Sequence, residues 1–169
     1  MRKFFFLLFS LALLSGACRE AGRNEEPALE PALQAENTDE GLAAISAQAQ
    51  ETLPEFFIRL GKPAGGESQF MVKCPFPADP GSGYGKEYLW LQNIRFRDGV
   101  YSAEVSNRPF YIEGLEAGST VAFSLDDVAD WMYVRDGRIE GGLSIKYLIE
   151  RIPELDRDRE MDSLLKLFE

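Results

Sequence analysis

Two Asp-Gly pairs constrain the fold of this sequence more than any other feature. Asp98-Gly99 and Asp136-Gly137 each stand between two short runs that are rich in aromatic and β-branched residues. Such a pair favours a tight turn between antiparallel strands, because both central positions of that turn need a positive φ. Each pair therefore predicts a β-hairpin. A sheet built from such hairpins is mainly antiparallel.

The strand-like composition extends over much of the middle of the chain. Five segments have it: residues 70–76, 87–96, 100–105, 108–115 and 119–125. The Gly-rich segment 79–88 lacks the spacing of a phosphate-binding loop and leads into a strand rather than a helix. It is therefore predicted to be a solvent-exposed connection between two strands.

Helical periodicity flanks the predicted strands on both sides. Apolar residues recur at spacings of three and four over residues 39–60, 145–152 and 161–168. About 130 residues can bury one hydrophobic core without a metal or a disulfide. The chain is therefore predicted to form a single α+β domain over residues 39–169, with an N-terminal helix, a mainly antiparallel sheet and two C-terminal helices.

Two local signals refine these helices. A capping box that starts at Thr52, next to Pro54, predicts that one helix ends near Gln50 and that another begins at Thr52. Ser124, followed three residues later by Asp127, predicts a short capped helical turn.

The first residues predict export. Two cations precede an apolar stretch that is too short to span a membrane, which is the order expected of a signal peptide over residues 1–17. The following "LSGAC" resembles a lipoprotein box in which Cys18 becomes the lipidated first residue, although its small residues also suit ordinary signal cleavage. Residues 18–38 are rich in Glu, Ala and Pro and predict a flexible tether. The protein is thus expected in the periplasm or anchored to the outer membrane.

Charge and residue content exclude several classes of function. The sequence has 28 acidic and 18 basic residues and no histidine. The acidic excess argues against nucleic acid as a partner, and a membrane is expected to be contacted only through a lipid anchor. Without histidine, the usual zinc sites and the Ser-His-Asp and Cys-His catalytic sets are excluded, so no metal or cofactor is predicted. Cys74, in a predicted strand, is expected to be buried and inert.

The most distinctive candidate site surrounds Asp130. Trp131 and Tyr133 follow it with the alternation that places both rings on one face of a strand. A structural role is the preferred interpretation, in which Trp131 fills the core and Asp130 caps a backbone amide or pairs with Arg138. The remaining candidate binding residues are Glu87, Trp90, Lys73 and Arg138.

Several separated motifs occur in order along the chain. They are "ETLPEFF", "FMVKCPF", "EYLWLQNI", "VSNRPF" with "GLEAGSTVAF", and "ADWMYVRDGRIEGGLSIKYLI". Over residues 43–165 these motifs resemble the YegJ-like bacterial proteins, domain of unknown function 2314. The sequence departs from that family at Tyr88, where histidine is expected, and at Ser119, where an acidic residue is usual. The resemblance implies an architecture, and it implies no activity or catalytic residue.

Two functional hypotheses follow from the sequence. The preferred one is a non-enzymatic envelope module that uses its aromatic residues to bind an envelope protein, a peptide or a glycan. The alternative is a histidine-free hydrolase or lyase with Asp130 or Glu87 as general acid or base. Convergence of Asp130, Trp131, Glu87 and Trp90 on one open pocket would favour both an enzyme and a protein that binds a small ligand.

Overall fold

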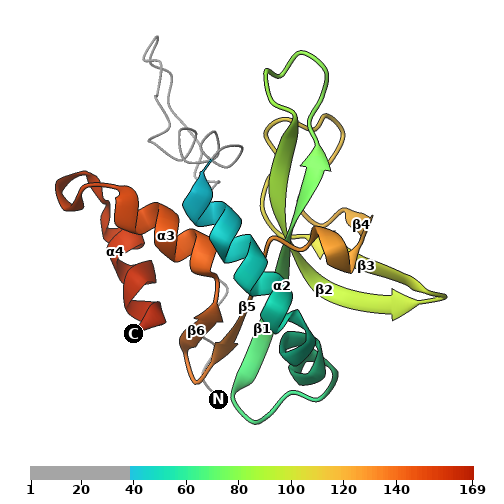
Figure 1. The fold of residues 1–169 in the computed structure, drawn as a ribbon, viewed down its shortest axis with the longest axis horizontal. Helices are drawn as coiled ribbons and strands as arrows, with labels where there is room; N and C mark the ends of the chain where they lie inside the picture. Colours follow the sequence, from blue (N-terminus) through green and yellow to red (C-terminus); the bar gives the residue numbers. More distant parts are fainter. Residues whose placement is uncertain (1–38) are drawn as a thin grey trace, which may run out of the picture.

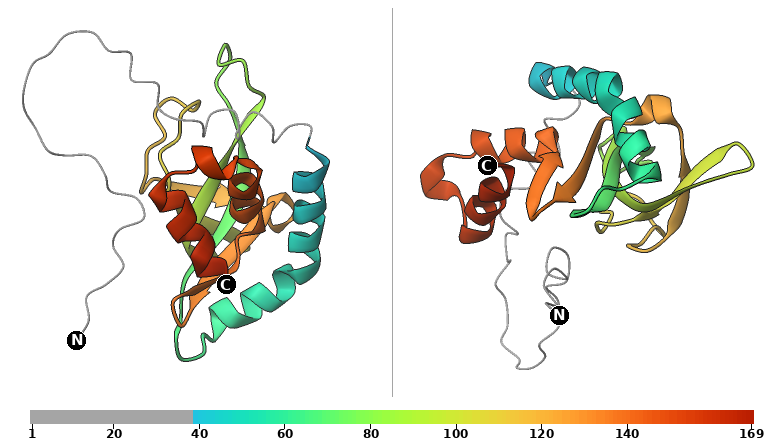
Figure 2. Two further views of the ribbon diagram at one scale, coloured as in Figure 1. Left: turned by 90° about the vertical axis from the view of Figure 1, so that its left-hand side faces the viewer. Right: turned by 90° about the horizontal axis from the view of Figure 1, so that it is seen from below.

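The computed structural model describes residues 39–169, and it confirms the predicted single α+β domain (Figure 1). A six-stranded antiparallel sheet has the strand order β4-β3-β2-β1-β5-β6. Helix α2 crosses one face of the sheet, and helices α3 and α4 lie beside strand β6 (Figures 1 and 2). The predicted signal peptide, Cys18 and the tether lie outside the described residues.

The elements follow one another along the chain, and the longest connection, residues 106–119, joins β3 to β4. The helices are α2 (Glu40–Gly61), α3 (Leu143–Arg151) and α4 (Arg159–Leu165). The strands are β1 (Glu67–Pro77), β2 (Lys86–Arg97), β3 (Val100–Val105), β4 (Thr120–Phe123), β5 (Asp130–Arg135) and β6 (Arg138–Gly141). A 3-10 turn at Leu125–Asp127 begins after Ser124, whose hydroxyl accepts a hydrogen bond from the Asp126 amide, which confirms the predicted capped turn.

Both predicted hairpins are confirmed. Asp98 and Gly99 have φ values of 52° and 80° and join β2 to β3, whereas Asp136 and Gly137 have φ values of 50° and 84° and join β5 to β6. Two successive positive φ angles define the turn type whose twist matches that of the flanking strands. The Asp-Gly pairs therefore set these two registers locally.

The predicted break in the first helix is wrong. Helix α2 is continuous from Glu40 to Gly61, and the Thr52 hydroxyl donates to the carbonyl of Gln48 (2.9 Å) instead of capping a new helix. Pro54 has no N–H for the preceding turn, which bends a helix without ending it when the flanking turns remain bonded. Figure 2 shows that α2 changes direction along its length. The bend lets one helix follow the curved sheet.

The predicted strand at residues 108–115 is also wrong, because this segment is irregular. The backbone amides of Phe110 and Tyr111 donate to the carboxylate of Glu87 at 2.9 Å each, and not to a neighbouring strand. Pro109 has no N–H to offer to a ladder. The buried carboxylate of Glu87 thus binds the backbone amides that a neighbouring strand would otherwise have bound.

Strand β1 is central over its first part and open at its end. Strand β5 pairs with β1 only as far as Lys73, whose carbonyl accepts from the amide of Ala129 (2.8 Å). Residues two apart in a strand direct their backbone N–H and C=O groups toward the same neighbouring strand. The backbone positions of Pro75 and Pro77 therefore face the same edge of β1 as Lys73, at a point that β5 no longer covers. Proline lacks the N–H that an added strand would need, so these residues fit the open edge and protect it from further pairing.

The core lies between α2 and one face of the sheet. Its most buried members are Phe56, Val72, Cys74, Leu89, Leu91, Val105 and Val128. The ring of Trp131 lies 5.5 Å from that of Phe56 and 6.0 Å from that of Tyr133, and its Nε1 donates to the Thr52 hydroxyl over 3.0 Å. Trp131 therefore fastens strand β5 to α2.

Replacing Trp131 with alanine should destabilise the domain by about 3 kcal/mol, because it removes a large packed ring together with a hydrogen bond. Trp131→Phe should cost clearly less, since it keeps most of the aromatic packing. Urea unfolding of both variants measures the difference. An alanine variant as stable as wild type would show that the ring contributes nothing to the core.

Candidate functional site

Asp130 holds the first turn of helix α3. Asp130 is 2% exposed. Its Oδ1 accepts a hydrogen bond from the backbone amide of Trp131 (2.8 Å), and its Oδ2 accepts one from the backbone amide of Ser144 (2.8 Å). Helix α3 follows Gly142, which has a φ of 64° and no side chain to cap the helix. Asp130 supplies the missing acceptor from the neighbouring strand. Burial raises the pKa of Asp130, and the hydrogen bonds from Ser144 and Trp131 oppose that rise.

Lys73 lies opposite Asp130 in the register of β1 and β5. Its side chain is only 6% exposed, and its Nζ lies 3.5 Å from the hydroxyl of Ser144, which is itself 3% exposed. We call Lys73, Asp130 and Ser144 the buried triad. Burying an ammonium group lowers the stability of the fold unless polar or charged groups lie next to it. Asp130 and Ser144 are such groups for Lys73.

The triad lies beside a cleft of about 540 Å³. Lys73 and Ser144 form part of its lining, together with Lys86 and Tyr88 of strand β2. The opposite wall is the N-terminal half of α2, where the lining residues are Leu42, Ala43, Ser46, Ala47 and Gln50. Small side chains on this helix face leave the space open. The cleft is thus bounded by residues of β1, β2, α2 and α3.

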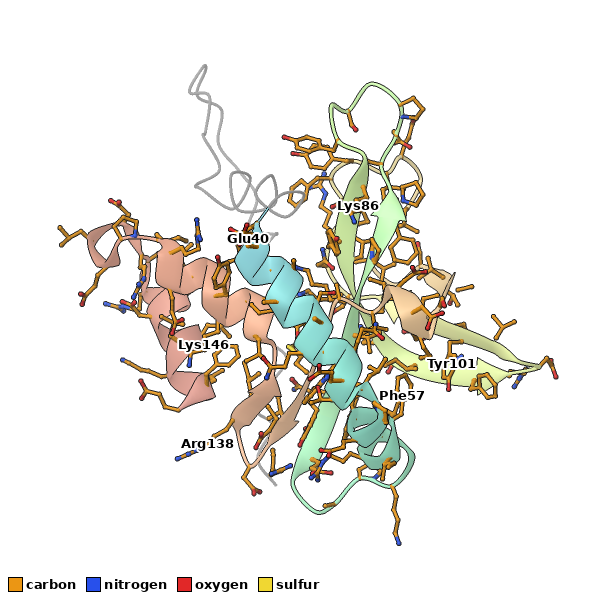
Figure 3. The ribbon with its side chains drawn as sticks, in the orientation of Figure 1. Glu40, Phe57, Lys86, Tyr101, Arg138 and Lys146 are labelled. Atoms are coloured by element: carbon orange, nitrogen blue, oxygen red, sulfur yellow. The ribbon has the colours of Figure 1, made fainter. Side chains whose placement is uncertain are left out.

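Tyr88 lies between two positive charges in the cleft wall. The ammonium nitrogens of Lys73 and Lys86 are 5.3 Å and 5.0 Å from the centre of its ring, within the range of cation–π attraction. Lys86 is exposed, and within residues 39–169 no carboxylate forms an ion pair with it. Figure 3 shows Lys86 and Glu40, at the start of α2, at the same end of the molecule.

Asp39 fixes the helical wall of the cleft. Its carboxylate accepts from the Gly41 amide (2.8 Å) and from the Tyr147 hydroxyl (2.7 Å), and Arg151 lies 3.4 Å away. The hydrogen bond from Tyr147 is the main cause of the lowered pKa of Asp39. Gly41 leaves room for the Tyr147 ring in this position, because a Cβ at residue 41 would lie 2.3 Å from the Tyr147 oxygen. Helices α2 and α3 therefore meet closely at the end of the cleft.

The sequence-predicted site residues do not converge on this cleft. By strand alternation and register, Lys73, Trp90 and Asp130 point to one side of the sheet. Glu87 and the ring of Trp131, with Tyr133, point to the other side. Of the seven residues, Lys73 alone is part of the cleft lining described above. Glu87 is occupied by two loop amides and Asp130 by the start of α3.

The predicted pairing of Asp130 with Arg138 is also wrong. Arg138 donates from Nη1 to the backbone carbonyl of Glu169 (2.7 Å), so it fastens the C-terminus to strand β6. Figure 3 shows Arg138 at the end of the molecule away from Lys86. The other structural interpretation of Asp130, the capping of a backbone amide, is the one that the structure contains.

The described residues offer little reactive chemistry. Burial raises the pKa of the Cys74 thiol to about 12, which leaves it protonated and a poor nucleophile at neutral pH. Within residues 39–169 no three acidic or cysteine side chains are grouped to hold a metal ion. In the same part of the chain no helix combines the length and the apolar character needed to cross a membrane.

Sequence reasoning missed the contributions of Lys86, Tyr88 and Ser144 to the cleft. Tyr88 carried one signal, since it stands where the family resemblance led us to expect histidine. Ser144 carried none, because its partners are 14 and 71 residues away in the sequence. Such a grouping becomes visible only when the strands and helices are placed together.

Comparison with known proteins agrees with the sequence motifs. The family model described as "Uncharacterized protein conserved in bacteria (DUF2314)" matches residues 39–164. A protein of Escherichia coli K12, "Uncharacterized protein YegJ", is 29% identical over 98 residues, which cover 57% of this chain and 61% of that protein. A "Putative ankyrin repeat protein" of Neisseria meningitidis serogroup B is 36% identical over 88 residues, covering 52% of this chain and 34% of that protein.

This chain spans less than two thirds of the length of either relative. No solved structure matches it.

Replacing Asp130 with asparagine should destabilise the domain by about 1–3 kcal/mol, because one of two buried amides would then face an NH₂ group in place of an acceptor. Denaturant unfolding measures this loss. The exposed Asp126 provides the control, since Asp126→Asn should change stability by less than about 0.5 kcal/mol. Equal stability of Asp130→Asn and wild type would contradict the capping role.

Proposed function

We propose that this chain, which belongs to the DUF2314 family of bacterial proteins, is an exported, non-enzymatic binding module whose ligand site is the cleft between α2, β2 and α3. The observation that carries the proposal is the use of the two candidate catalytic acids. The carboxylates of Asp130 and Glu87 both accept hydrogen bonds from backbone amides, and they point to opposite sides of the sheet. An acid so engaged is poorly placed to exchange protons with a substrate.

The cleft has the character of a binding site. It combines a few polar groups from the triad with an aromatic ring and small apolar side chains, and this mixture is typical of pockets that take small ligands or chain ends. Partly buried hydrogen bonds hold its walls in place. Gln50 of α2, for example, donates to the carbonyls of Leu125 (2.9 Å) and Val128 (2.6 Å). A rigid site loses little entropy when a ligand binds.

A Ser-Lys hydrolase would be the enzymatic reading of the same residues. Ser144 and Lys73 lie 3.5 Å apart, but Ser144 is nearly inaccessible and its backbone amide donates to Asp130. That amide is therefore not available to stabilise an oxyanion.

Filling the cleft tests its role directly. In Ala47→Trp an indole would occupy the cleft, whereas Ala44→Trp adds the same ring to an exposed position of α2 outside the lining. The probe is a pool of N-acetylated dipeptides, half with free and half with amidated C-termini, added to the full chain and followed by amide NMR. We expect shifts at cleft residues in wild type and in Ala44→Trp, and none in Ala47→Trp. Shifts confined to another surface would contradict the proposed site.

The export proposal rests on the signal-like first residues, on Cys18 and on the Pro/Glu-rich segment that follows it. Cys18→Ala should move the protein from the membrane pellet to the soluble envelope fraction, because the lipidated residue would be lost. Immunoblots of fractionated cells measure the change. A soluble wild-type protein with an unmodified N-terminal cysteine would contradict lipid anchoring.

A further inference from the structure

Strand β4 is an outermost strand of the sheet and is joined to β3 through a β-bulge. Gly118, with a φ of 90°, donates its amide to the carbonyl of Val105 (2.7 Å), and the amide of Val105 donates to the carbonyl of Ser119 (2.9 Å). Two residues of one strand thus face one residue of the other, which is the arrangement of a bulge. The bulge fixes which of the following residues direct their backbone toward β3, because such residues alternate in an antiparallel pair.

The residues of β4 that face outward are Thr120 and Ala122. Counted from the bulge, Val121 and Phe123 are the residues that exchange hydrogen bonds with β3. Thr120 and Ala122 direct both their N–H and their C=O groups away from β3. Both residues are exposed, and no other backbone group of residues 39–169 is hydrogen-bonded to these outward groups. The edge therefore offers two donors and two acceptors to an added strand.

The β4 edge lacks the features that protect the other edges of the sheet. Pro75 and Pro77 protect the open end of β1, and Arg138 fastens the C-terminus to β6. Residues 119–124, by contrast, contain neither a proline nor a charged side chain. An unprotected edge of this kind can pair with an extended segment of another chain.

Acidic side chains flank both ends of this edge. Glu116 lies just before β4, where its amide donates to the hydroxyl of Ser119 (3.1 Å). Asp126 and Asp127 lie just after it, in the 3-10 turn. All three acids are exposed, and within the described part of the chain none of them forms an ion pair. Residues 109–134 contain no lysine or arginine.

The nearest cations of the sheet are on β2, since β3 and β4 contain none. Arg95 is paired with Glu104 (3.4 Å), and Arg97 is followed by the acidic Asp98. Arg108, in the connection before β4, lies beside the first half of β2. Strand β2 is two strand spacings from β4, about 10 Å, which is close to the screening length in moderate salt. The surroundings of the β4 edge are therefore acidic.

We propose that the β4 edge binds an extended segment of another protein that has lysine or arginine at both ends of an uncharged, β-branched centre. The backbone of this segment pairs with Thr120 and Ala122, and its cations meet the acids at the two ends of β4. A second copy of the chain fits less well, because two antiparallel β4 strands would place Glu116 of one copy next to Asp126 of the other. No residue of β4 lines the cleft, so this site is independent of the proposed cleft function.

Two peptides test the chemistry of the partner. One has the sequence Arg-Thr-Val-Thr-Val-Arg and the other has glutamate in place of both arginines, and both are acetylated and amidated at their ends. In NMR titrations of the full chain at low salt, the arginine peptide should bind about tenfold more tightly. Binding should also slow hydrogen exchange at the amides of Thr120 and Ala122, because these amides become hydrogen-bonded.

Two variants of Ala122 distinguish strand addition from simple attraction between charges. Ala122→Pro removes one outward N–H, and it should fold, because β3 does not use that N–H and an edge strand tolerates proline at such a position. It should weaken binding of the arginine peptide about tenfold. Ala122→Thr keeps the N–H and should bind as wild type does. Unchanged affinity in a folded Ala122→Pro would overturn the proposal.

Charge variants test why the partner is cationic. Glu116→Gln combined with Asp126→Asn should weaken binding of the arginine peptide about fivefold, which is the size expected of two exposed ion pairs. The matched control is Glu154→Gln combined with Asp156→Asn, which removes the same charge from an exposed turn between α3 and α4. The control should leave the affinity unchanged. Equal effects of the two double variants would contradict local recognition by the acids.

The remaining outcomes identify other occupants of the edge or other sites for the peptide. Equal binding of the two peptides, or no binding of the arginine peptide at millimolar concentration, would overturn the proposal. Slowed exchange at Thr120 and Ala122 that grows with protein concentration alone would also overturn it, because a second copy would then occupy the edge. Ala47→Trp fills the cleft and should leave peptide binding intact. Loss of binding in that variant would show that the peptide enters the cleft and not the β4 edge.

Discussion

The buried carboxylate of Asp130 joins the sheet to helix α3, and the cleft depends on that junction. Two backbone amides, one on β5 and one on α3, donate to its two oxygens. Removing this shared acceptor would leave the amides of Trp131 and Ser144 without their partner, which lowers the stability of the fold. Within residues 39–169 no buried side-chain nitrogen or oxygen lacks a partner. Asp130 is therefore structural, yet it also determines where Ser144 and Lys73 lie.

Close approach of two helices completes the cleft. Gly41 allows the Tyr147 ring against the start of α2, and the Asp39 carboxylate links the N-terminus of α2 to Tyr147 and Arg151. Further along, Thr52 accepts the indole N–H of Trp131, close to the bend at Pro54. One half of α2 thus covers the core, whereas the other half forms a wall. The same helix supports both stability and the proposed binding site.

Local sequence signals predicted the elements well and the site poorly. The Asp-Gly pairs needed no distant partner to specify their hairpins, because a two-residue turn is determined by the φ angles that its own residues can adopt. The strand predicted at residues 108–115 failed because the carboxylate of Glu87, more than 20 residues earlier in the chain, binds its amides. Similarly, the capping box at Thr52 failed because packing against the sheet kept α2 continuous through Pro54.

The sequence by itself determined the α+β class, both tight hairpins, the helical periodicity and the lack of histidine chemistry. Each of these depends on residues that are neighbours in the chain or on composition alone. Tertiary structure alone decided which polar groups meet. Lys73, Asp130 and Ser144 come from β1, β5 and α3, and they are brought together by strand order and by the capping of α3. Strand alternation then separated Asp130 from Glu87, because side chains on opposite faces of a sheet cannot share a pocket.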